Sequence, residues 1–304
     1  MSNAPDFIIM GAMKCATTTL HEQLEAQAGI FMSEPKEPNF FSDDDQFDRG
    51  IDYYQSLFEI ASRGDICGES STHYTKLPTY PSTVKRIYQY LPTVKLIYVM
   101  RHPVERLISQ YIHEWSQKAI SVGLSQALEH HPELYQYSLY SMQLRPYLET
   151  FGSENVLPVF LERLKQYPDQ EFDRICQFIG YTQPARWQRD LKHQHASRER
   201  MRKSAWRDAL VNAPILSDIR RHLVPQSTRD WVKGFWQMQQ RPRLSDRERA
   251  WLEAKFDQDL AILGDWLGRE LSCKNFVSAT LDSPASWVHA KVPQCQILQP
   301  QPSP

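Results

Sequence analysis

Three short apolar runs, each followed by a helical pattern, organise the first part of the chain. The runs at 6–10 (DFIIM), 95–100 (KLIYVM) and 156–161 (VLPVFL) are rich in β-branched and aromatic residues and predict strands. The apolar positions that recur at helical spacing after these runs are Leu20 and Leu24; Val104, Leu107, Ile108, Tyr111 and Trp115; and Phe172, Ile175, Cys176 and Ile179. Strands that alternate with helices indicate an α/β fold with a central, mainly parallel sheet flanked by helices.

The pattern changes after about residue 185. A basic stretch at 186–207, RWQRDLKHQHASRERMRKSAWR, precedes helical patterns at 205–240 and 246–268. The second of these keeps its apolar residues on one side and ends at Gly268. We expect both to be helices that pack on the sheet.

The end of the chain has a different composition. From about Ser278 it is rich in Pro, Gln and Ser, which bury little apolar surface. The whole chain has 304 residues, 41% of them apolar and 23% charged, which is typical of a globular protein. We therefore expect one domain over residues 1–277 and a mobile tail over residues 278–304.

Charge and cysteine content exclude several classes of protein. The formal net charge of −1 provides no overall field that would hold the protein on nucleic acid or an anionic membrane, so anion binding must be local. The five cysteines are scattered and lack metal-ligand spacing, which predicts neither a disulfide framework nor a zinc site. The apolar run near the start is too short for a signal peptide, and we find no run of membrane-spanning length. We expect a cytoplasmic protein.

The first segment with candidate chemistry is GAMKCATTTL, between the first predicted strand and its helix. Backbone N–H groups at a helix N-terminus, a lysine and several hydroxyl groups form a cradle for phosphate-like oxygens. The segment is not a Walker A sequence, because Met13 stands where that sequence has glycine before the lysine. The predicted cradle residues are Lys14, Cys15, Ala16, Thr17, Thr18 and Thr19. The alternative is an ordinary turn in which Thr17 or Thr18 caps the helix.

The second segment is YVMRHPVERLISQY, in which the second apolar run ends at Arg101. A nucleotide-hydrolysing protein is expected to carry an aspartate here that helps hold Mg²⁺. Arg101 instead offers paired donors to a second phosphate, and the Ser109 hydroxyl can add another. Two anion pockets at neighbouring strand ends fit a nucleotide phosphorylated at both ends of its ribose. The alternative is an ion pair between Arg101 and Glu105.

The third segment is the loop EPKEPNFFSDD, which contains Glu37. A carboxylate close to a transferable group can act as a general base if it reaches the proton of the acceptor. Phe40 and Phe41 would anchor the loop beside Glu37, which makes it the favoured candidate. The alternative is a solvated loop acid with no catalytic role.

Together these segments resemble the sulfotransferases that use 3'-phosphoadenosine-5'-phosphosulfate (PAPS), in particular the heparan-sulfate-type and bacterial carbohydrate-type branch. The matching residues are Lys14, Thr17, Thr18 and Leu20 of a KxGTTxL-like motif, Arg101 and Ser109 of a 3'-phosphate motif, Glu37 before two phenylalanines, Gly68, Glu69 and Ser70 of GESSTHY, and Tyr140 of a Gly/Ser-x-Tyr-like helix. The match is clearest over residues 6–115 and stays collinear to about residue 270. It implies the P-loop-containing nucleotide-binding fold of the sulfotransferases.

Two residues depart from the family pattern. Ala16 stands where the family usually has glycine, which implies strain if the position needs a positive φ. Ser70 stands where the heparan-type enzymes carry a lysine, which leaves Lys14 as the main cation near the sulfonate.

The resemblance also implies roles for individual residues. Glu37 would deprotonate the acceptor hydroxyl, Lys14 would stabilise the leaving phosphate oxygen, and no metal would be required. His73 is a rival base, by similarity to cytosolic sulfotransferases of small phenols and steroids. Arg198 and Arg202 fall where relatives have a loop that closes over the nucleotide, and the alternative for them is a solvated basic helix.

The expected activity is transfer of sulfonate from PAPS to a hydroxyl of a carbohydrate, glycolipid or secondary metabolite, with 3'-phosphoadenosine-5'-phosphate (PAP) as product. The expected partner is a small-molecule or glycan acceptor, whose sugar faces Trp115, Tyr135, Tyr137 or Tyr140 could stack against. Two alternatives are a P-loop small-molecule kinase, which would need Mg²⁺ and an acidic strand end, and a nucleotide-binding module without catalysis. The oligomeric state is not predicted.

Overall fold

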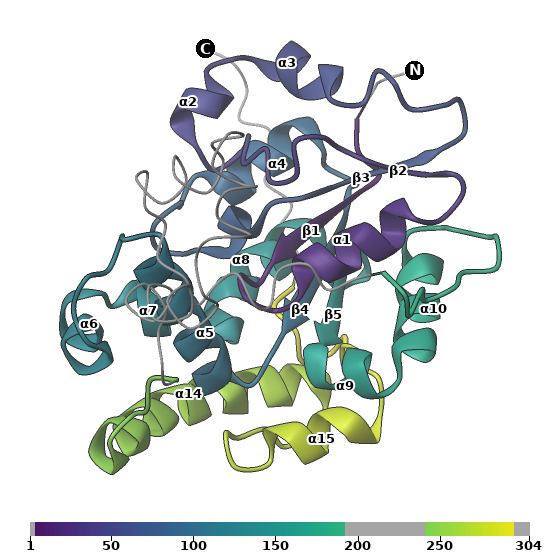
Figure 1. Ribbon diagram of the computed structural model, residues 1–304. Helices are drawn as coiled ribbons and strands as arrows, with labels where there is room; N and C mark the ends of the chain where they lie inside the picture. Colours follow the sequence, from purple (N-terminus) through teal and green to yellow (C-terminus); the bar gives the residue numbers. More distant parts are fainter. Residues whose placement is uncertain (1–3, 192–240, 295–304) are drawn as a thin grey trace, which may run out of the picture.

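The structure is a computed structural model that describes residues 4–191 and 241–294. In this part of the chain five parallel strands form one sheet in the order β2-β3-β1-β4-β5 (Figure 1). The strands are β1 (Phe7–Gly11), β2 (Ile30–Met32), β3 (Ile66–Ser70), β4 (Lys95–Met100) and β5 (Val156–Phe160). The predicted α/β class with a parallel sheet is therefore confirmed.

Three of the strands coincide with the three apolar runs of the sequence. β1, β4 and β5 are buried along their whole length apart from Lys95, as expected for the centre of a parallel sheet covered on both faces. β2 and β3 were not predicted, because β2 has only three residues and β3 ends in the polar pair Glu69 and Ser70. Gly68 allows β3 to pack closely on β1, since a Cβ there would lie 2.1 Å from the Phe7 ring.

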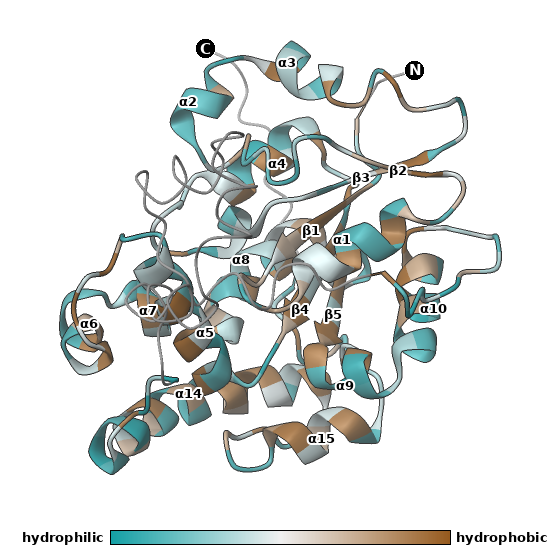
Figure 2. Cartoon of the chain, in the orientation of Figure 1, coloured by the Kyte–Doolittle hydropathy of each residue, from teal (hydrophilic) through white to brown (hydrophobic). Residues whose placement is uncertain are grey.

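Helices cover both faces of the sheet. Those before residue 180 are α1 (Thr17–Glu25), α2 (Asp44–Phe47), α3 (Ile51–Ser56), α4 (Thr83–Tyr90), α5 (Pro103–Ser116), α6 (Leu124–His130), α7 (Glu133–Gln136), α8 (Tyr140–Phe151), α9 (Leu161–Gln166) and α10 (Pro168–Phe178), with the short 3-10 helices η1 (Thr72–Thr75) and η2 (Ser153–Asn155). Figure 1 shows α1 in front of the sheet and α8 behind it. Figure 2 shows the apolar residues gathered on the central strands and on the sides of helices that face them. The apolar core therefore lies between these layers.

The last described part of the chain packs on this core. Helix α14 (Asp246–Leu267) begins with a capping box between Ser245 and Glu248 and ends at Gly268, as the pattern at 246–268 predicted. Helix α15 (Phe276–Asp282) follows. The helical pattern predicted at 205–240 lies outside the described residues.

Residues 278–294 of the expected tail are part of the described structure, and residues 295–304 lie outside it. The expected boundary at 278 falls inside α15, and the segment after this helix packs beside β5, where Ala285 and Val292 are buried. The Trp287 Nε1–H donates to the carbonyl oxygen of Val156 at 2.6 Å. A few well-placed apolar residues hold this segment, although its average composition is polar.

Arg174 of α10 extends the same contact region. Its Nη2 donates to the carbonyl oxygen of Pro158 in β5 at 2.9 Å, and its Nη1 donates to that of Ala285 at 3.0 Å. The segment after α15 and helix α10 are thus both joined to β5, which is the last strand of the sheet.

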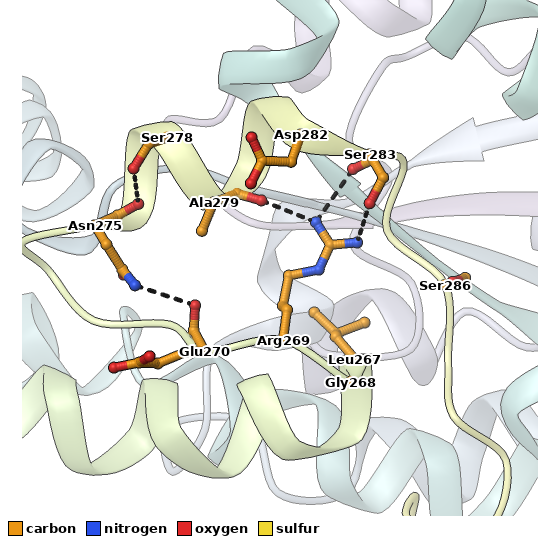
Figure 3. Close-up of a pocket in the computed structure, with 10 residues that line it drawn as sticks. All are labelled: Leu267, Gly268, Arg269, Glu270, Asn275, Ser278, Ala279, Asp282, Ser283 and Ser286. Carbon is orange, nitrogen blue, oxygen red and sulfur yellow. Dashed lines mark hydrogen bonds between the residues drawn. The ribbon is translucent and has the colours of Figure 1, made fainter.

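A pocket of about 490 Å³ lies between the end of α14 and α15 (Figure 3). The guanidinium group of Arg269 crosses it and donates to the carbonyl oxygens of Ala279, Ser283 and Pro284 at 3.0, 3.1 and 2.8 Å. A further bond joins it to the Ser283 hydroxyl at 3.1 Å. Because α15 and the residues after it already take up these donors, Arg269 is a structural link between the two helices.

Candidate functional site

The turn from β1 into α1 has an unusual backbone. The Ala12 N–H donates to the carbonyl oxygen of Val99 in β4 at 2.8 Å, and the Cys15 N–H donates to that of Ala12 at 3.1 Å. Lys14 and Ala16 both have positive φ, at 70° and 60°. Ala16 therefore occupies the left-handed region that glycine favours, which is the strained outcome that the departure from the family pattern implied.

Ala16 is also the N-cap residue of α1, and no side chain in the described structure caps this helix. The alternative in which Thr17 or Thr18 caps the turn is therefore not what the structure shows. The first-turn N–H groups, from Thr17 to Thr19, have no carbonyl partner within the helix, and they lie at the positive end of its dipole. This end of α1 can bind an anion, with Lys14 in the same turn.

Cys15 differs from its neighbours in this turn. Its thiol is fully buried, lies 3.8 Å from the carbonyl oxygen of Met13, and has a pKa raised to about 12 by burial. The Cys15 N–H already donates to the carbonyl oxygen of Ala12, and the thiol is buried. The predicted role of Cys15 in binding the nucleotide therefore depends only on its place in the turn.

Arg101 lies directly after β4 and reaches this turn. Its Nη1 lies 3.5 Å from the carbonyl oxygen of Lys14, and its Nη2 lies 3.4 Å from Oε2 of Glu105 on α5. The Tyr140 hydroxyl holds the Arg101 backbone, accepting from its N–H at 3.2 Å and donating to its carbonyl oxygen at 2.5 Å. Ser109 lies one turn beyond Glu105 on α5 and is half-buried. The structure thus shows the predicted ion pair and also joins Arg101 to the turn at Lys14.

Glu37 lies next to the end of β3, on the other side of β1 from Arg101 at the end of β4. Its N–H donates to the carbonyl oxygen of Ser70 at 2.9 Å. Its carboxylate forms an ion pair with Lys36 at 2.9 Å and accepts from the Thr72 hydroxyl at 3.0 Å. Burial raises the pKa of Glu37, but the charge and hydrogen bond of Lys36 and the hydrogen bond from Thr72 outweigh it and hold the pKa below its usual value. Glu37 is therefore a carboxylate at neutral pH.

A second carboxyl group, Glu69, supports the loop that carries Glu37. It is fully buried and accepts from the Tyr54 and Ser71 hydroxyls, both at 3.0 Å, while Ser71 accepts from the Asn39 N–H at 3.1 Å. Burial raises the pKa of Glu69 to about 7, even though hydrogen bonds from Tyr74, Tyr54 and Ser71 lower it. Glu69 thus connects the end of β3 to the loop two residues after Glu37.

Ser70, one of the two departures from the implied family pattern, has a partner on α1. Its hydroxyl lies 2.9 Å from Nδ1 of His21, which is buried on α1. Burial, followed by the charge of Lys36, lowers the pKa of His21 to about 4. A neutral imidazole and a hydroxyl therefore occupy this place.

His73, the rival base, belongs to η1. Its ring stacks on Tyr80 with centroids 5.0 Å apart, and its Nδ1 is buried without a hydrogen-bond partner in the described structure. Burial and then Lys76 lower the pKa of His73 to about 4, so the ring is neutral at pH 7. The role of His73 as a base stays a prediction.

Sequence reasoning missed Lys76, which directly follows η1. Its side chain is 8% exposed, and its ammonium group lies 5.8 Å from the centre of the Tyr137 ring. Burial lowers the pKa of Lys76 to about 8, although Glu114 and Glu37 raise it. A lone lysine after a loop motif gives no signal in sequence, because only the fold shows that it is buried near Glu37.

Other predictions meet the limits of the described chain. Arg198 and Arg202 lie outside the described residues. Within the described residues no group of three or more His, Cys, Asp or Glu side chains could hold a metal ion. No helix in residues 4–191 and 241–294 is both long enough and apolar enough to cross a membrane.

The protein is therefore an α/β protein with charged groups at the carboxyl ends of three neighbouring strands. Two cationic corners, at Lys14 after β1 and at Arg101 after β4, lie beside the Glu37 carboxylate at the end of β3. The sequence profile of the sulfotransferase domain matches residues 4–243. The chain belongs to the sulfotransferase family.

Individual relatives agree with this assignment. Heparan sulfate glucosamine 3-O-sulfotransferase 6 of Mus musculus is 31% identical over 185 residues, which cover 58% of this chain and 52% of the relative. The membrane-associated sulfotransferase kil1 of Dictyostelium discoideum is 32% identical over 131 residues, which cover 41% of this chain and 27% of the relative. The chain thus spans between about a quarter and a half of the length of these relatives.

Among solved structures, a sulfotransferase from Alicyclobacillus acidocaldarius has the same fold. The TM-score is 0.61 at 24% sequence identity, with 88% of this chain and 97% of the other covered. The expected sulfotransferase fold is therefore confirmed.

Proposed function

We propose that this protein transfers a sulfonate group from PAPS to a hydroxyl group of a glycan or small-molecule acceptor. One contact carries the proposal: Nη1 of Arg101 lies 3.5 Å from the carbonyl oxygen of Lys14. This contact places the two cationic corners next to each other. A nucleotide with phosphate at both ends of its ribose matches such a pair of corners. Glu37 provides a carboxylate at the same sheet edge.

The residues present fit the nucleotide. Lys14 and the first-turn amides of α1, from Thr17 to Thr19, would hold the 5'-phosphate, because no side chain in the described structure caps those amides and the lysine lies in the same turn. Arg101, with Ser109 on the same helix face as Glu105, would hold the 3'-phosphate. PAPS supplies a sulfonate that is activated by its bond to the 5'-phosphate.

The chain's own groups supply the rest of the chemistry. Glu37 accepts the proton of the acceptor hydroxyl, and the Thr72 hydroxyl and Lys36 hold its carboxylate in place. Lys14 and the first-turn amides stabilise the negative charge that remains on the 5'-phosphate. No residue in this scheme needs a metal ion.

A glycan acceptor is supported by the names of the heparan sulfate relatives, and a hydroxyl group by the name of the glucosamine 3-O-sulfotransferase. We propose a glycan hydroxyl as the first class to test. The cytoplasm is the proposed compartment, because the four cysteines in the described part of the chain are all unpaired.

The proposal is tested first by calorimetry with PAP in EDTA and with ATP plus Mg²⁺, for wild type and Arg101→Ala. We expect metal-free PAP binding that Arg101→Ala weakens by about 1.5 to 3 kcal/mol, the scale of a charged hydrogen bond. Binding of ATP with Mg²⁺ alone would instead indicate a kinase. Sulfonate transfer from PAPS to a panel of glycans then separates an enzyme from a binding module.

A further inference from the structure

Lys36 and Glu37 are neighbours in the chain, and their side chains pair with each other. Nζ of Lys36 lies 2.9 Å from Oε1 of Glu37, with exposed fractions of 24% and 31%. In an extended segment successive side chains point to opposite sides. Glu37 instead has a φ of 60°, in the left-handed region, and its N–H donates to the carbonyl oxygen of Ser70 at 2.9 Å. The backbone thus turns at Glu37, and the turn lets the ammonium group meet the carboxylate.

This pairing opposes the role of Glu37 as a base. One carboxylate oxygen, Oε1, accepts from Lys36, and the other, Oε2, accepts from the Thr72 hydroxyl at 3.0 Å. Burial raises the pKa of Glu37, but Lys36 and Thr72 together hold that pKa below its usual value. A carboxylate with a lower pKa is a weaker acceptor for the proton of a hydroxyl group. Glu37 would therefore be a stronger base if Lys36 left Oε1 when the substrates bind.

A second place for the Lys36 ammonium group lies nearby, at the start of α1. Ser70, which accepts from the Glu37 N–H, also bonds through its hydroxyl to Nδ1 of His21 at 2.9 Å. His21 and Thr17 are both buried and lie on the same side of α1, one turn apart. After burial, the charge of Lys36 is the next cause that lowers the pKa of His21 to about 4. The ammonium group therefore lies on the side of α1 that leads to the turn proposed for the 5'-phosphate.

The charges around this place favour a negatively charged ligand. His21 and His73 are neutral at pH 7 because the pKa of each is lowered to about 4, and Lys76 is a cation. Within residues 4–191 and 241–294, Glu37 is the carboxylate that pairs with Lys36, and ion pairs at such exposure are weak. A sulfonate group on the 5'-phosphate brings negative charge and acceptor oxygens to the start of α1. It can therefore compete with Glu37 for Lys36.

We propose that Lys36 is a catalytic residue that leaves Glu37 and donates to the sulfonate group of bound PAPS. This inference rests on the proposed use of PAPS. In the protein without substrates, Lys36 neutralises Glu37. With PAPS bound, the ammonium group contacts a sulfonate oxygen, and Oε1 of Glu37 becomes available to the acceptor hydroxyl. Thr72 still holds Oε2.

The bonds and charges of the transfer step balance. The acceptor oxygen forms a bond to sulfur, and its proton passes to Glu37. The bond between sulfur and the bridging oxygen breaks, and its electron pair stays on the 5'-phosphate of PAP. Lys36 keeps its proton throughout and contributes only its charge and its hydrogen bond to the sulfonate. Arrival of the sulfonate donor thereby activates the base.

The test compares PAPS, which carries the sulfonate, with PAP, which lacks it, by calorimetry on the full chain in EDTA without acceptor. The variants are Lys36→Gln, Lys36→Arg, Glu37→Gln and the double variant that combines Lys36→Gln with Glu37→Gln. The matched control is Lys291→Gln, because Lys291 also pairs with a carboxylate, that of Asp265, at 2.7 Å on the surface.

We expect Lys36→Gln to weaken PAPS binding about 10-fold and to leave PAP binding unchanged, because only PAPS carries the sulfonate. Lys36→Arg keeps the charge and should weaken PAPS binding less. Glu37→Gln should strengthen PAPS binding by about threefold, since Lys36 then has no carboxylate to leave, and the double variant should lose this gain. Lys291→Gln should change the binding of neither nucleotide.

Several results would overturn the inference. They are a Lys36→Gln variant that binds PAPS as wild type does, an equal loss for PAPS and PAP in that variant, and weaker PAPS binding in Glu37→Gln. If wild type binds neither nucleotide without metal, the proposed function fails as well. Metal-free binding of both nucleotides, with a PAPS to PAP affinity ratio that is insensitive to Lys36, removes only the present inference.

Discussion

Glu37 is fixed in place from three sides, although it lies in a loop. Its backbone has a positive φ of 60° and donates to the carbonyl oxygen of Ser70, while Lys36 and Thr72 hold its carboxylate. A general base must meet one proton in one geometry, and these contacts limit the orientations that the carboxylate can adopt. Glu37 is thus a loop acid with defined partners for both its backbone and its carboxylate.

Glu37→Gln keeps the size of the side chain and removes the base. We expect the rate of sulfonate transfer from PAPS to fall by about 10²- to 10⁴-fold, with PAP affinity unchanged in calorimetry. Glu34→Gln, an exposed acid in the same loop, is the control and should retain wild-type rates. A Glu37→Gln rate within threefold of wild type would shift the role of base to His73.

Ala16 stores strain that glycine would relieve. A non-glycine residue in the left-handed region costs about 1 to 2 kcal/mol, and glycine loses about 0.5 to 1 kcal/mol more backbone entropy on folding. We expect Ala16→Gly to raise the free energy of unfolding by about 1 kcal/mol in urea titrations. Ala26→Gly is the control, because Ala26 has a φ of −75° and glycine there should destabilise. Equal effects of the two substitutions would contradict the argument.

At the scale of elements, sequence patterns found the strands that carry the anion-binding turns. β1, β4 and β5 are continuous apolar runs because both faces of each strand are buried, and this signal needs no knowledge of neighbours. β3 gave no such signal, since its last residues are polar and are buried only because partners such as Tyr54 lie across from them. The hydrophobic pattern of the sequence does not show which distant residues will bond to these polar groups, so it could not predict β3.

The same limit applies to the site. Lys14, Arg101 and Glu37 stand in short motifs whose order along the chain is itself informative. His21 and Lys76 have no motif, and their burial depends on how α1 and η1 pack against the sheet. The motif residues could therefore be predicted, whereas the groups that surround them could not.

The buried carboxyl group at the end of β3 makes stability depend on pH. The pKa of Glu69 is about 7 in the folded protein, against an ordinary value of 4.5, so the folded state holds a proton that the unfolded state releases between these pH values. The free energy of unfolding therefore decreases as pH rises from 4.5 to 7, by about 3 kcal/mol from this group. His21 and His73, with lowered pKa values, act in the opposite direction.

Glu69→Gln removes this titration and leaves the histidines unchanged. The difference in unfolding free energy between the variant and wild type should move in favour of the variant by about 3 kcal/mol between pH 4.5 and 7.5. Denaturant titrations at several pH values measure it, with the exposed Glu59→Gln as control. A difference that is constant with pH would show that Glu69 is ionised throughout.

At the scale of the whole molecule, one arginine joins the C-terminal helices. Arg269 connects the end of α14 to four acceptors at the end of α15 and just beyond it (Figure 3). We expect Arg269→Gln to lower the free energy of unfolding by about 2 kcal/mol, because charged donors are lost and carbonyl groups are left without partners. Arg247→Gln, at an exposed position of α14, should change it by less than about 0.5 kcal/mol. Similar losses in both variants would contradict a linking role.

The contacts at β5 have a consequence for solubility. An open strand edge offers unpaired N–H and carbonyl groups to which a strand of another molecule can add. Here Pro158 has no N–H to offer, and Trp287 and Arg174 already occupy the carbonyl oxygens of Val156 and Pro158. The opposite edge, β2, is only three residues long. Both ends of the sheet thus resist the strand-to-strand growth that leads to aggregation.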